Sequence, residues 1–254
     1  MSEKRAKLSA VFITNNSEET LEQSLRSVSF ADEIVICDNY SKDRTHAIAK
    51  KYNAKIYKHN FQGFGSQKNF ALSKARGSWV LLLDSDEVLS AELQLEIEQI
   101  ILENPSLDGF TISYQNYFLG HPLTCKAQRY AKVRLFRKGR GWVVDIPIHE
   151  EVRVEGKLGR FKNKILHYSF RSIPQTLSKF TYYARIEAPL LWKKGERATL
   201  KKLTMYPLHM FWSIFVEDEG YKDGLWGFGL AVCFAYYEFA RYFYLLLKQI
   251  DHQK

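Results

Sequence analysis

The sequence predicts an α/β domain with a mixed sheet, followed by a helical region rich in aromatic residues. Up to about residue 104, short apolar runs typical of strands alternate with helical segments, which indicates a parallel sheet. From about Asp108 the chain is strand-like without evident crossover helices, which predicts partly antiparallel pairing. Beyond about Pro174 it turns helical and aromatic. We therefore expect one domain over residues 1–170 and a second region over residues 171–254.

The first half of the chain repeats a unit of one strand and one helix. Ser17 and Ser41 precede the first two helices and are their expected N-caps, because a hydroxyl oxygen can accept from free backbone amides. The expected strands are LSAVFIT (8–14), EIVICD (33–38), AKIYKH (54–59) and SWVLLLD (78–84). The last of these is apolar enough to be buried on both faces of the sheet.

Acidic side chains directly follow this apolar strand. Asp84 and Asp86 are two residues apart, so in extended backbone they project to the same side. Two carboxylates about 4 Å apart repel by roughly 1 kcal/mol in water and by more in a poorly solvated crevice. A divalent cation relieves this repulsion, and a nucleotide diphosphate can complete its coordination. Alternatively, both aspartates cap the helix that begins near Ser90 and lie in water.

Two other strand ends also carry polar side chains. Asp38 ends the second strand, and Asn15 and Asn16 follow the first. The carboxyl ends of parallel strands meet at one edge of an open α/β sheet, where the ligand crevice lies. The sequence therefore predicts a metal and phosphate site at this edge.

Composition and charge restrict the classes of function. The formal net charge of +9 indicates an anionic partner, such as nucleic acid, a phosphorylated substrate or a bilayer surface. Readers of nucleic acid need a basic groove with stacking aromatics, whereas these strand ends are acidic, so no nucleic-acid partner is expected. The three cysteines lie far apart and the first residues do not form a secretory signal, which favours a cytoplasmic location.

Four segments, taken in order, resemble the family 2 glycosyltransferases of GT-A fold. They are AVFITNNSEETLEQSLRSV, ADEIVICDNYSKDRT, QKNFALSKARGSWVLLLDSDE and VRLFRKGR…IHEEV, across roughly Leu8 to Val152. Within this family the resemblance is greatest to bacterial lipopolysaccharide core β-1,4-glucosyltransferases, which transfer glucose from UDP-glucose to an inner-core heptose. It implies a GT-A (Rossmann-like) nucleotide-sugar domain, a UDP-sugar donor and a divalent cation, Mg²⁺ or Mn²⁺.

The resemblance also implies roles for the residues at the strand ends. Asp38 would hold the uridine, and Asn15 would line the same pocket. Asp84 would contact the ribose or the metal, and Asp86 would ligate the metal that bridges the diphosphate.

Inverting sugar transfer needs one base that takes the proton of the acceptor hydroxyl while the sugar–phosphate bond breaks. Asp145, Glu150 and Glu151 are the candidates. The segment DIPIHEEV resembles the family's H-E block, which implies Glu150 as the base and His149 as a neighbour of metal or phosphate. Alternatively, Glu150 and Glu151 form a solvated turn beside Arg153, and His149 is a structural histidine.

Basic and amide side chains are expected to meet the phosphates. Lys68 and Asn69 are candidate donors to phosphate or sugar, although Lys68 can equally be an ordinary solvated lysine. An arginine fork suits phosphate, so Arg134 and Arg137 are candidates for acceptor phosphates. They belong to a basic group ahead of the H-E block, of which part can be simple solubilising surface: Arg129, Arg134, Arg137, Lys138 and Arg140.

The helical region carries a candidate membrane contact. Leu225–Lys248 is long enough to span a bilayer, but Glu238 and Arg241 lie near its middle and can pair, so a spanning helix is not favoured. We expect the region to lie on the membrane surface, and the alternative is a helical subdomain packed in its own core or across a dimer interface. The basic cluster expected to attract anionic lipid is Lys193, Lys194, Arg197, Lys201 and Lys202.

These observations and the resemblance together predict an inverting, metal-dependent glycosyltransferase. It would move glucose from UDP-glucose to a heptose of the lipopolysaccharide inner core, a lipid-linked saccharide, at the inner face of the cytoplasmic membrane. The alternatives are the same chemistry on another lipid-linked or protein acceptor, and a non-catalytic basic module that binds membranes. A homo-oligomer is compatible with the sequence.

Overall fold

The structure, a computed structural model, describes residues 7–144, 146 and 150–252. It divides into two compact units. The first contains the chain up to Tyr114 and Tyr130–His167, and the second contains Gln115–Arg129 and the chain from Tyr168 on. The second unit therefore begins close to the boundary expected at residue 170, but it also takes in a segment from the middle of the chain.

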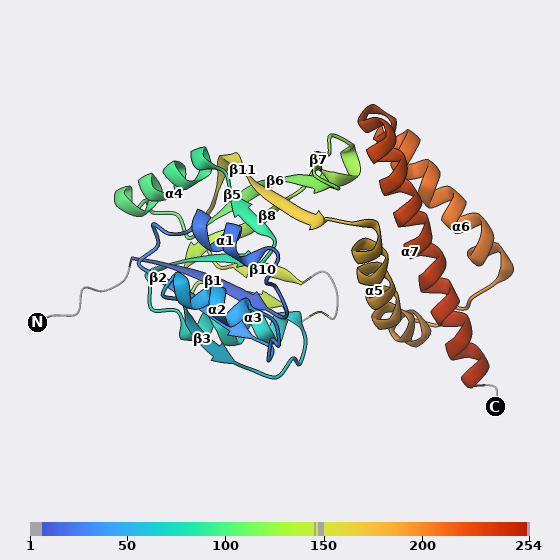
Figure 1. Cartoon of the computed structure of the whole chain (residues 1–254), viewed down its shortest axis with the longest axis horizontal. Coiled ribbons are helices and arrows are strands. Elements are labelled where there is room, and N and C mark those ends of the chain that lie inside the picture. The colour runs from blue at the N-terminus through green and yellow to red at the C-terminus, as the bar shows by residue number, and fades with distance from the viewer. Residues whose placement is uncertain (1–6, 145, 147–149, 253–254) are drawn as a thin grey trace, which may run out of the picture. The chain divides into compact units, whose positions relative to one another are not determined.

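The first unit is built on a mixed sheet with the strand order β3-β2-β1-β4-β8-β6-β11-β5 (Figure 1). Strands β3, β2, β1 and β4 run parallel, as the alternation of strands and helices predicts. Strands β8 and β5 pair antiparallel with β4 and β11 respectively, which confirms the predicted mixed sheet. The strands are β1 (Leu8–Thr14), β2 (Glu33–Asp38), β3 (Lys55–Lys58), β4 (Trp79–Asp84), β5 (Glu87–Leu89), β6 (Gly109–Phe118), β7 (His121–Pro122), β8 (Ala131–Arg137), β9 (Gly141–Val144), β10 (Glu151–Val154) and β11 (Leu158–Phe170).

Apolar side chains cover both faces of the parallel strands. In β4 every residue from Trp79 to Leu83 is buried, which confirms the prediction made from its apolar run. Leu81 packs in one cluster with α1 and α4, and Leu82 packs in another with α3, because neighbouring residues of a strand face opposite sides. The helices of this unit are α1 (Leu21–Ser27), α2 (Thr45–Lys51), α3 (Phe64–Lys74) and α4 (Ala91–Glu103).

The two predicted N-caps are wrong. Helices α1 and α2 begin further along the chain, and their cap residues make no side-chain cap bond. Ser41 instead donates to the carboxylate of Asp38 at 2.5 Å, and Ser17 accepts from the hydroxyl of Ser85 at 3.1 Å. Both serines therefore tie strand ends together rather than starting helices.

The second unit is mainly helical and aromatic, as predicted. Helix α7 packs on α5 through the rings of Phe234 and Phe180, whose centres are 5.0 Å apart. It packs on α6 through Tyr242 and Tyr206, at 5.4 Å. The elements are α5 (Ile173–Lys193), α6 (Leu200–Trp212) and α7 (Gly224–Asp251), a π-helical turn at Ser213–Glu217, and 3₁₀ turns at Lys126–Gln128 and Gly220–Asp223.

Candidate functional site

Two of the acidic strand ends lie on either side of β1. Thr14 at the end of β1 pairs with Asp38 of β2, and its neighbour Ile13 pairs with Asp84 of β4. Parallel pairing therefore puts Asp38 and Asp84 at the same edge of the sheet, as the sequence predicts. This is the edge at which open α/β sheets bind ligands.

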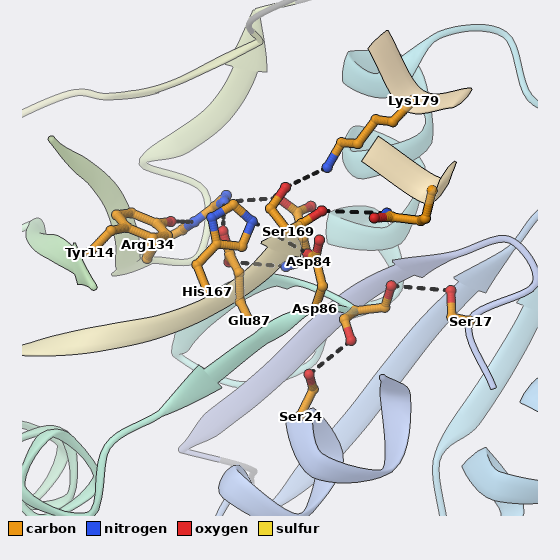
Figure 2. Close-up of polar contacts among 12 residues, drawn as sticks. Ser17, Ser24, Asp84, Asp86, Glu87, Tyr114, Arg134, His167, Ser169 and Lys179 are labelled. Carbon is orange, nitrogen blue, oxygen red and sulfur yellow. Dashed lines mark hydrogen bonds and ion pairs between the residues drawn. The ribbon is translucent and has the colours of Figure 1, made fainter. Parts of the chain in front are cut away.

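Asp84 is held by two cations from different elements. Its Oδ1 lies 2.7 Å from Nζ of Lys68 in α3, and its Oδ2 accepts from Nη2 of Arg134 in β8 at 2.9 Å. The side chains of Lys68 and Arg134 are only 1% and 3% exposed. Arg134 also donates to Glu87 and to the hydroxyl of Tyr114, both at 2.5 Å (Figure 2). We call Lys68, Asp84, Glu87, Tyr114 and Arg134 the Asp84 cluster.

The protein itself therefore balances the charge of Asp84. Burial raises the pKa of this carboxyl, but Lys68 and Arg134 lower it by a larger amount. The net pKa is therefore well below the ordinary value. Burial lowers the pKa of Lys68, and the neighbouring carboxylates of Asp84 and Glu150 more than reverse this effect. These groups are consequently charged at neutral pH, and Asp84 receives from two side chains the compensation that sequence analysis assigned to a metal ion.

Lys68 also reaches the candidate base. Its Nζ donates to Oε1 of Glu150 at 2.6 Å, so one ammonium joins the end of β4 to the residue that precedes β10. The next residue of α3, Asn69, donates to the carbonyl of Val143 in β9 at 2.8 Å and accepts from its amide at 2.9 Å. Strands β9 and β10 pair with each other, so α3 holds both sides of this pair.

Asp86 lies near a histidine that sequence analysis did not single out. Its Oδ1 is 3.6 Å from Nε2 of His167, which pairs with Glu87 across strands β11 and β5 (Figure 2). The other ring nitrogen, Nδ1, is 3.3 Å from the hydroxyl of Tyr130. Histidines that ligate metals are commonly oriented through their second nitrogen in this way.

Asp86 and His167 fit part of a divalent-cation site. They offer one carboxylate and one imidazole, and a diphosphate can supply further oxygen ligands. Within residues 7–144, 146 and 150–252, no group of three or more His, Cys, Asp or Glu side chains is arranged to hold a metal. Two predicted residues, Asp145 and His149, lie outside the described residues.

Asp38, the predicted uridine contact, is fully enclosed. It accepts from the hydroxyls of Thr14 and Ser41 and from the Ser41 amide, and lies 2.7 Å from His46. Burial raises its pKa, but the hydrogen bonds from Ser41, Thr14 and His46 lower it below the ordinary value. Asn15 is exposed, and its amide donates to a backbone carbonyl of the loop after β2 at 2.7 Å.

The two arginines expected at acceptor phosphates have other partners. Arg134 belongs to the Asp84 cluster. Arg137 donates to two backbone carbonyls, and its guanidinium lies 4.4 Å from the ring centre of Trp79. Trp79 begins β4 whereas Asp84 ends it, so Arg137 lies away from the cluster.

Lys132 is a further cation beside the Asp84 cluster. It precedes Arg134 by two residues in β8, so both side chains project to the same side. The residue as a whole is exposed. Its pKa is lowered by burial and by Arg134, against the opposing effect of Asp84 and Glu87. Among the described residues, no carboxylate forms an ion pair with Lys132. Its Nζ lies 5.7 Å from the ring centre of Tyr130.

The interpretation that the aspartates cap α4 is wrong. The hydroxyl of Ser90 caps this helix by accepting from the amide of Leu93 at 3.2 Å. Glu87, His167 and Lys132 were not among the site residues predicted from the sequence. Glu87 directly follows Asp86, so its charge could have been noticed in the sequence. His167 is brought opposite Glu87 only by the pairing of β11 with β5, which joins distant parts of the chain.

Comparison with known sequences identifies the family. The sequence model of glycosyl transferase family 2 matches residues 9–149, more than half of the chain. The chain belongs to glycosyltransferase family 2. Its mixed sheet with covering helices, followed by a helical, aromatic-rich region, confirms the predicted GT-A fold class.

Several full-length relatives are also glycosyltransferases. An uncharacterized glycosyltransferase of Rickettsia conorii is 30% identical over 249 residues, covering 92% of this chain and 88% of the relative. The lipopolysaccharide core biosynthesis glycosyltransferase LpsC of Rhizobium meliloti is 27% identical over 240 residues, covering 91% of this chain and 89% of the relative.

Two solved structures are similar to this family 2 glycosyltransferase. Residues 1–349 of S. aureus TarS, in complex with UDP-GlcNAc, align with a TM-score of 0.49 and 16% identity, covering 98% of this chain and 92% of that chain. Glucosyl-3-phosphoglycerate synthase from Mycobacterium tuberculosis, in complex with Mn²⁺, UDP and glucosyl-3-phosphoglycerate, aligns with a TM-score of 0.44 and 15% identity, covering 75% and 81%.

Proposed function

We propose that this family 2 glycosyltransferase is an inverting, metal-dependent enzyme that transfers glucose from UDP-glucose to a heptose of the lipopolysaccharide inner core. Similarity to LpsC over most of both chains supports the acceptor class. The observation that carries the proposal is the bridge made by Lys68, whose ammonium contacts both Asp84 at the strand end and Glu150. Asp84, at the strand end where the donor is proposed to bind, and the candidate base Glu150 therefore contact the same ammonium.

The donor binds along the carboxyl ends of β1, β2 and β4. Asn15 lines the uridine pocket, and Asp38 acts on the uridine through the loop that its four contacts hold. Asp84 accepts from the ribose while it stays paired with the cations around it. Asn69 contributes by holding β9, and thereby the strand pair that carries Glu150.

Asp86 and His167 would hold the divalent cation, Mg²⁺ or Mn²⁺. The metal role of His149, which lies outside the described residues, stays a prediction. Oxygen and imidazole ligands suit either ion, and the diphosphate completes the coordination. When bound, the cation supplies positive charge that stabilises the leaving diphosphate.

Glu150 acts as the base of a single displacement. Its carboxylate takes the proton of the acceptor hydroxyl, and the acceptor oxygen forms a bond to the anomeric carbon of glucose. The bond between that carbon and the diphosphate oxygen breaks, its electron pair leaves with UDP, and the configuration inverts. The proton on Glu150 then passes to water.

Lys132 contacts a phosphate of the donor or of the acceptor. Unlike Arg134, it is not in an ion pair with a carboxylate within the described chain, and burial, followed by the charge of Arg134, lowers its pKa. A phosphate offsets this charge with a charge-assisted hydrogen bond. Lys132 thereby takes the role at a phosphate that the sequence predicted for Arg134 and Arg137.

The lipid-linked acceptor puts the reaction at the inner face of the cytoplasmic membrane. A screen of nucleotide sugars that measures UDP release, with membrane lipid as the acceptor, tests donor and acceptor together. We expect turnover with UDP-glucose and heptose-containing core lipid. Turnover only with another lipid-linked or a protein acceptor would keep the chemistry and refute the acceptor.

The metal site is tested by UDP binding. We expect UDP to bind only with Mg²⁺ or Mn²⁺ present, and Asp86→Asn to weaken binding by roughly tenfold or more, because a charged ligand is lost. Glu92→Gln, which removes an exposed carboxylate at the start of α4, is the matched control. Metal-independent binding of UDP contradicts the proposed site.

A further inference from the structure

Helix α6 has apolar side chains on its solvent side as well as on its inner side. The helix is described in full, and none of its residues is buried. Its inner side chains, among them Tyr206 and Phe211, contact rings of α7. On the outer side, Leu200, Met205, Leu208 and Trp212 are 78%, 49%, 63% and 55% exposed. We call these four residues the outer stripe of α6.

The outer stripe follows helical periodicity. Leu200, Leu208 and Trp212 are spaced by multiples of four residues, so they line one side of the helix, and Met205 lies beside them. Surface apolar residues scattered singly are normal, whereas contiguous exposed apolar side chains mark a binding surface. We therefore expect the outer stripe to bind an apolar partner.

A basic segment adjoins the start of this stripe. Lys193, Lys194, Arg197 and Lys201 are all exposed, and we call them the basic segment. Lys202, which was expected in the same cluster, instead pairs with Glu196. Within the described part of the chain, Lys194 and Lys201 are in no ion pair. The partner of α6 is therefore expected to be anionic as well as apolar.

We infer that the outer stripe of α6 and the basic segment form a surface that binds an anionic lipid bilayer without crossing it. Leucine and tryptophan insert at the boundary between headgroups and acyl chains, and lysines nearby attract anionic headgroups. A second copy of this chain fits less well, because a self-complementary contact presents the same apolar and basic patch and brings no anionic group to the basic segment. The inference goes beyond the proposed function, since it depends on neither donor nor acceptor.

Helix α7 has a different role. The stretch Gly220–Asp251 is long and apolar enough to cross a bilayer by length and composition. However, Arg241 donates to Glu238 at 2.6 Å, as predicted, and also pairs with Glu187 of α5. Three charged side chains thus join α5 to the middle of α7. Burying these charges in the core of a bilayer would cost free energy. We assign α7 to the core of the helical unit and the membrane contact to α6.

Vesicle co-sedimentation of the full chain tests the inference. We expect binding to vesicles of phosphatidylglycerol and phosphatidylethanolamine, and weak binding to phosphatidylcholine. Leu208→Glu/Trp212→Glu should weaken binding by roughly tenfold or more, because two inserted apolar side chains are lost. Lys194→Glu/Lys201→Glu should have a similar effect and should remove most of the salt dependence.

Leu95→Glu/Leu102→Glu is the matched control, because these leucines are 67% and 75% exposed on α4 in the first unit. It should bind vesicles as the wild type does. UDP binding and the melting temperature show that each variant is folded, and they separate failure of this inference from failure of the proposed function. Unchanged vesicle binding of Leu208→Glu/Trp212→Glu overturns the inference, as does a change of this variant from dimer to monomer without lipid.

Discussion

The ammonium of Lys68 donates to Oε1 of Glu150 at 2.6 Å, across 82 positions of sequence. The same ammonium lies 2.7 Å from Asp84, so it holds two carboxylates of different proposed function together. Because Lys68 is almost completely buried, this contact cannot be replaced by water without cost. It links the stability of the site directly to its proposed chemistry.

Replacing Glu150 by glutamine should strongly slow transfer and leave donor binding nearly intact. The amide keeps a carbonyl that can accept from Lys68, but it cannot take a proton from the acceptor. We expect kcat to fall by about 100-fold or more, with UDP affinity within about twofold of wild type. Single-turnover transfer and calorimetric titration with UDP measure the two quantities separately.

Glu151→Gln is the matched control for this variant. The neighbouring Glu151 is exposed and lies 3.5 Å from Arg153, with which it forms a surface ion pair. Its replacement should leave kcat close to that of the wild type. Near-normal turnover of the Glu150 variant would show that another group is the base.

Replacing Lys68 by methionine should destabilise the first unit. The change leaves Glu150 without its cation and Asp84 with Arg134 alone, and removing one partner of a buried ion pair is costly. We expect the free energy of unfolding in urea to fall by about 3 kcal/mol. Lys74→Met, which removes a lysine from the last turn of the same helix, should change it little. Equal stability of both variants would mean that the pairs formed by Lys68 contribute nothing net.

Replacing Lys132 by methionine should weaken ligand binding without lowering the stability of the fold. Burial and Arg134 lower the pKa of Lys132, so the charged ammonium is disfavoured in the folded state. The variant should therefore unfold at no lower urea concentration than wild type, while its affinity for UDP or for phosphorylated acceptor falls about tenfold. Lys162→Met, at an exposed position of β11, is the control. A loss of stability without loss of affinity would contradict the phosphate contact.

Local patterns predicted the sheet and the acidic residues at its edge. The run from Trp79 to Leu83 is apolar at every position, and Asp84 follows at once, so burial and charge could both be read locally. The sequence also indicates that the two arginines have different roles. Arg134 and Arg137 are three residues apart in a strand, so they project to opposite faces and could not both meet one ligand.

Residues whose roles depend on distant pairing could not be predicted in this way. Ser41 has the residue type of an N-cap, but its hydroxyl is engaged by Asp38, which lies before it in another element. His167 becomes relevant only through the antiparallel pairing of β11 with β5. The burial of Lys68 likewise depends on Glu150, which lies far along the chain. Such contacts are set by tertiary packing, which overrides local preference.

The enclosed carboxylate of Asp38 should make stability depend on pH in the acid range. Its pKa is lower in the folded protein than the value of about 3.9 expected in the unfolded chain. Its contribution to stability is therefore complete above about pH 3.9 and is lost as the pH falls toward its folded pKa. Asp38→Asn removes this titration and weakens the hydrogen bonds from Ser41 and Thr14, at a cost of about 2 kcal/mol near neutral pH.

Urea unfolding of wild type and Asp38→Asn from pH 7 to pH 3 measures this effect. The difference in free energy of unfolding should be constant at higher pH and should narrow below about pH 4, because only the wild type loses the contribution there. His46 contacts the same carboxylate, so the series is repeated in a His46→Gln background, which removes this imidazole contact. A difference that stays constant down to pH 3 would show that Asp38 is not stabilised in its charged form by these contacts.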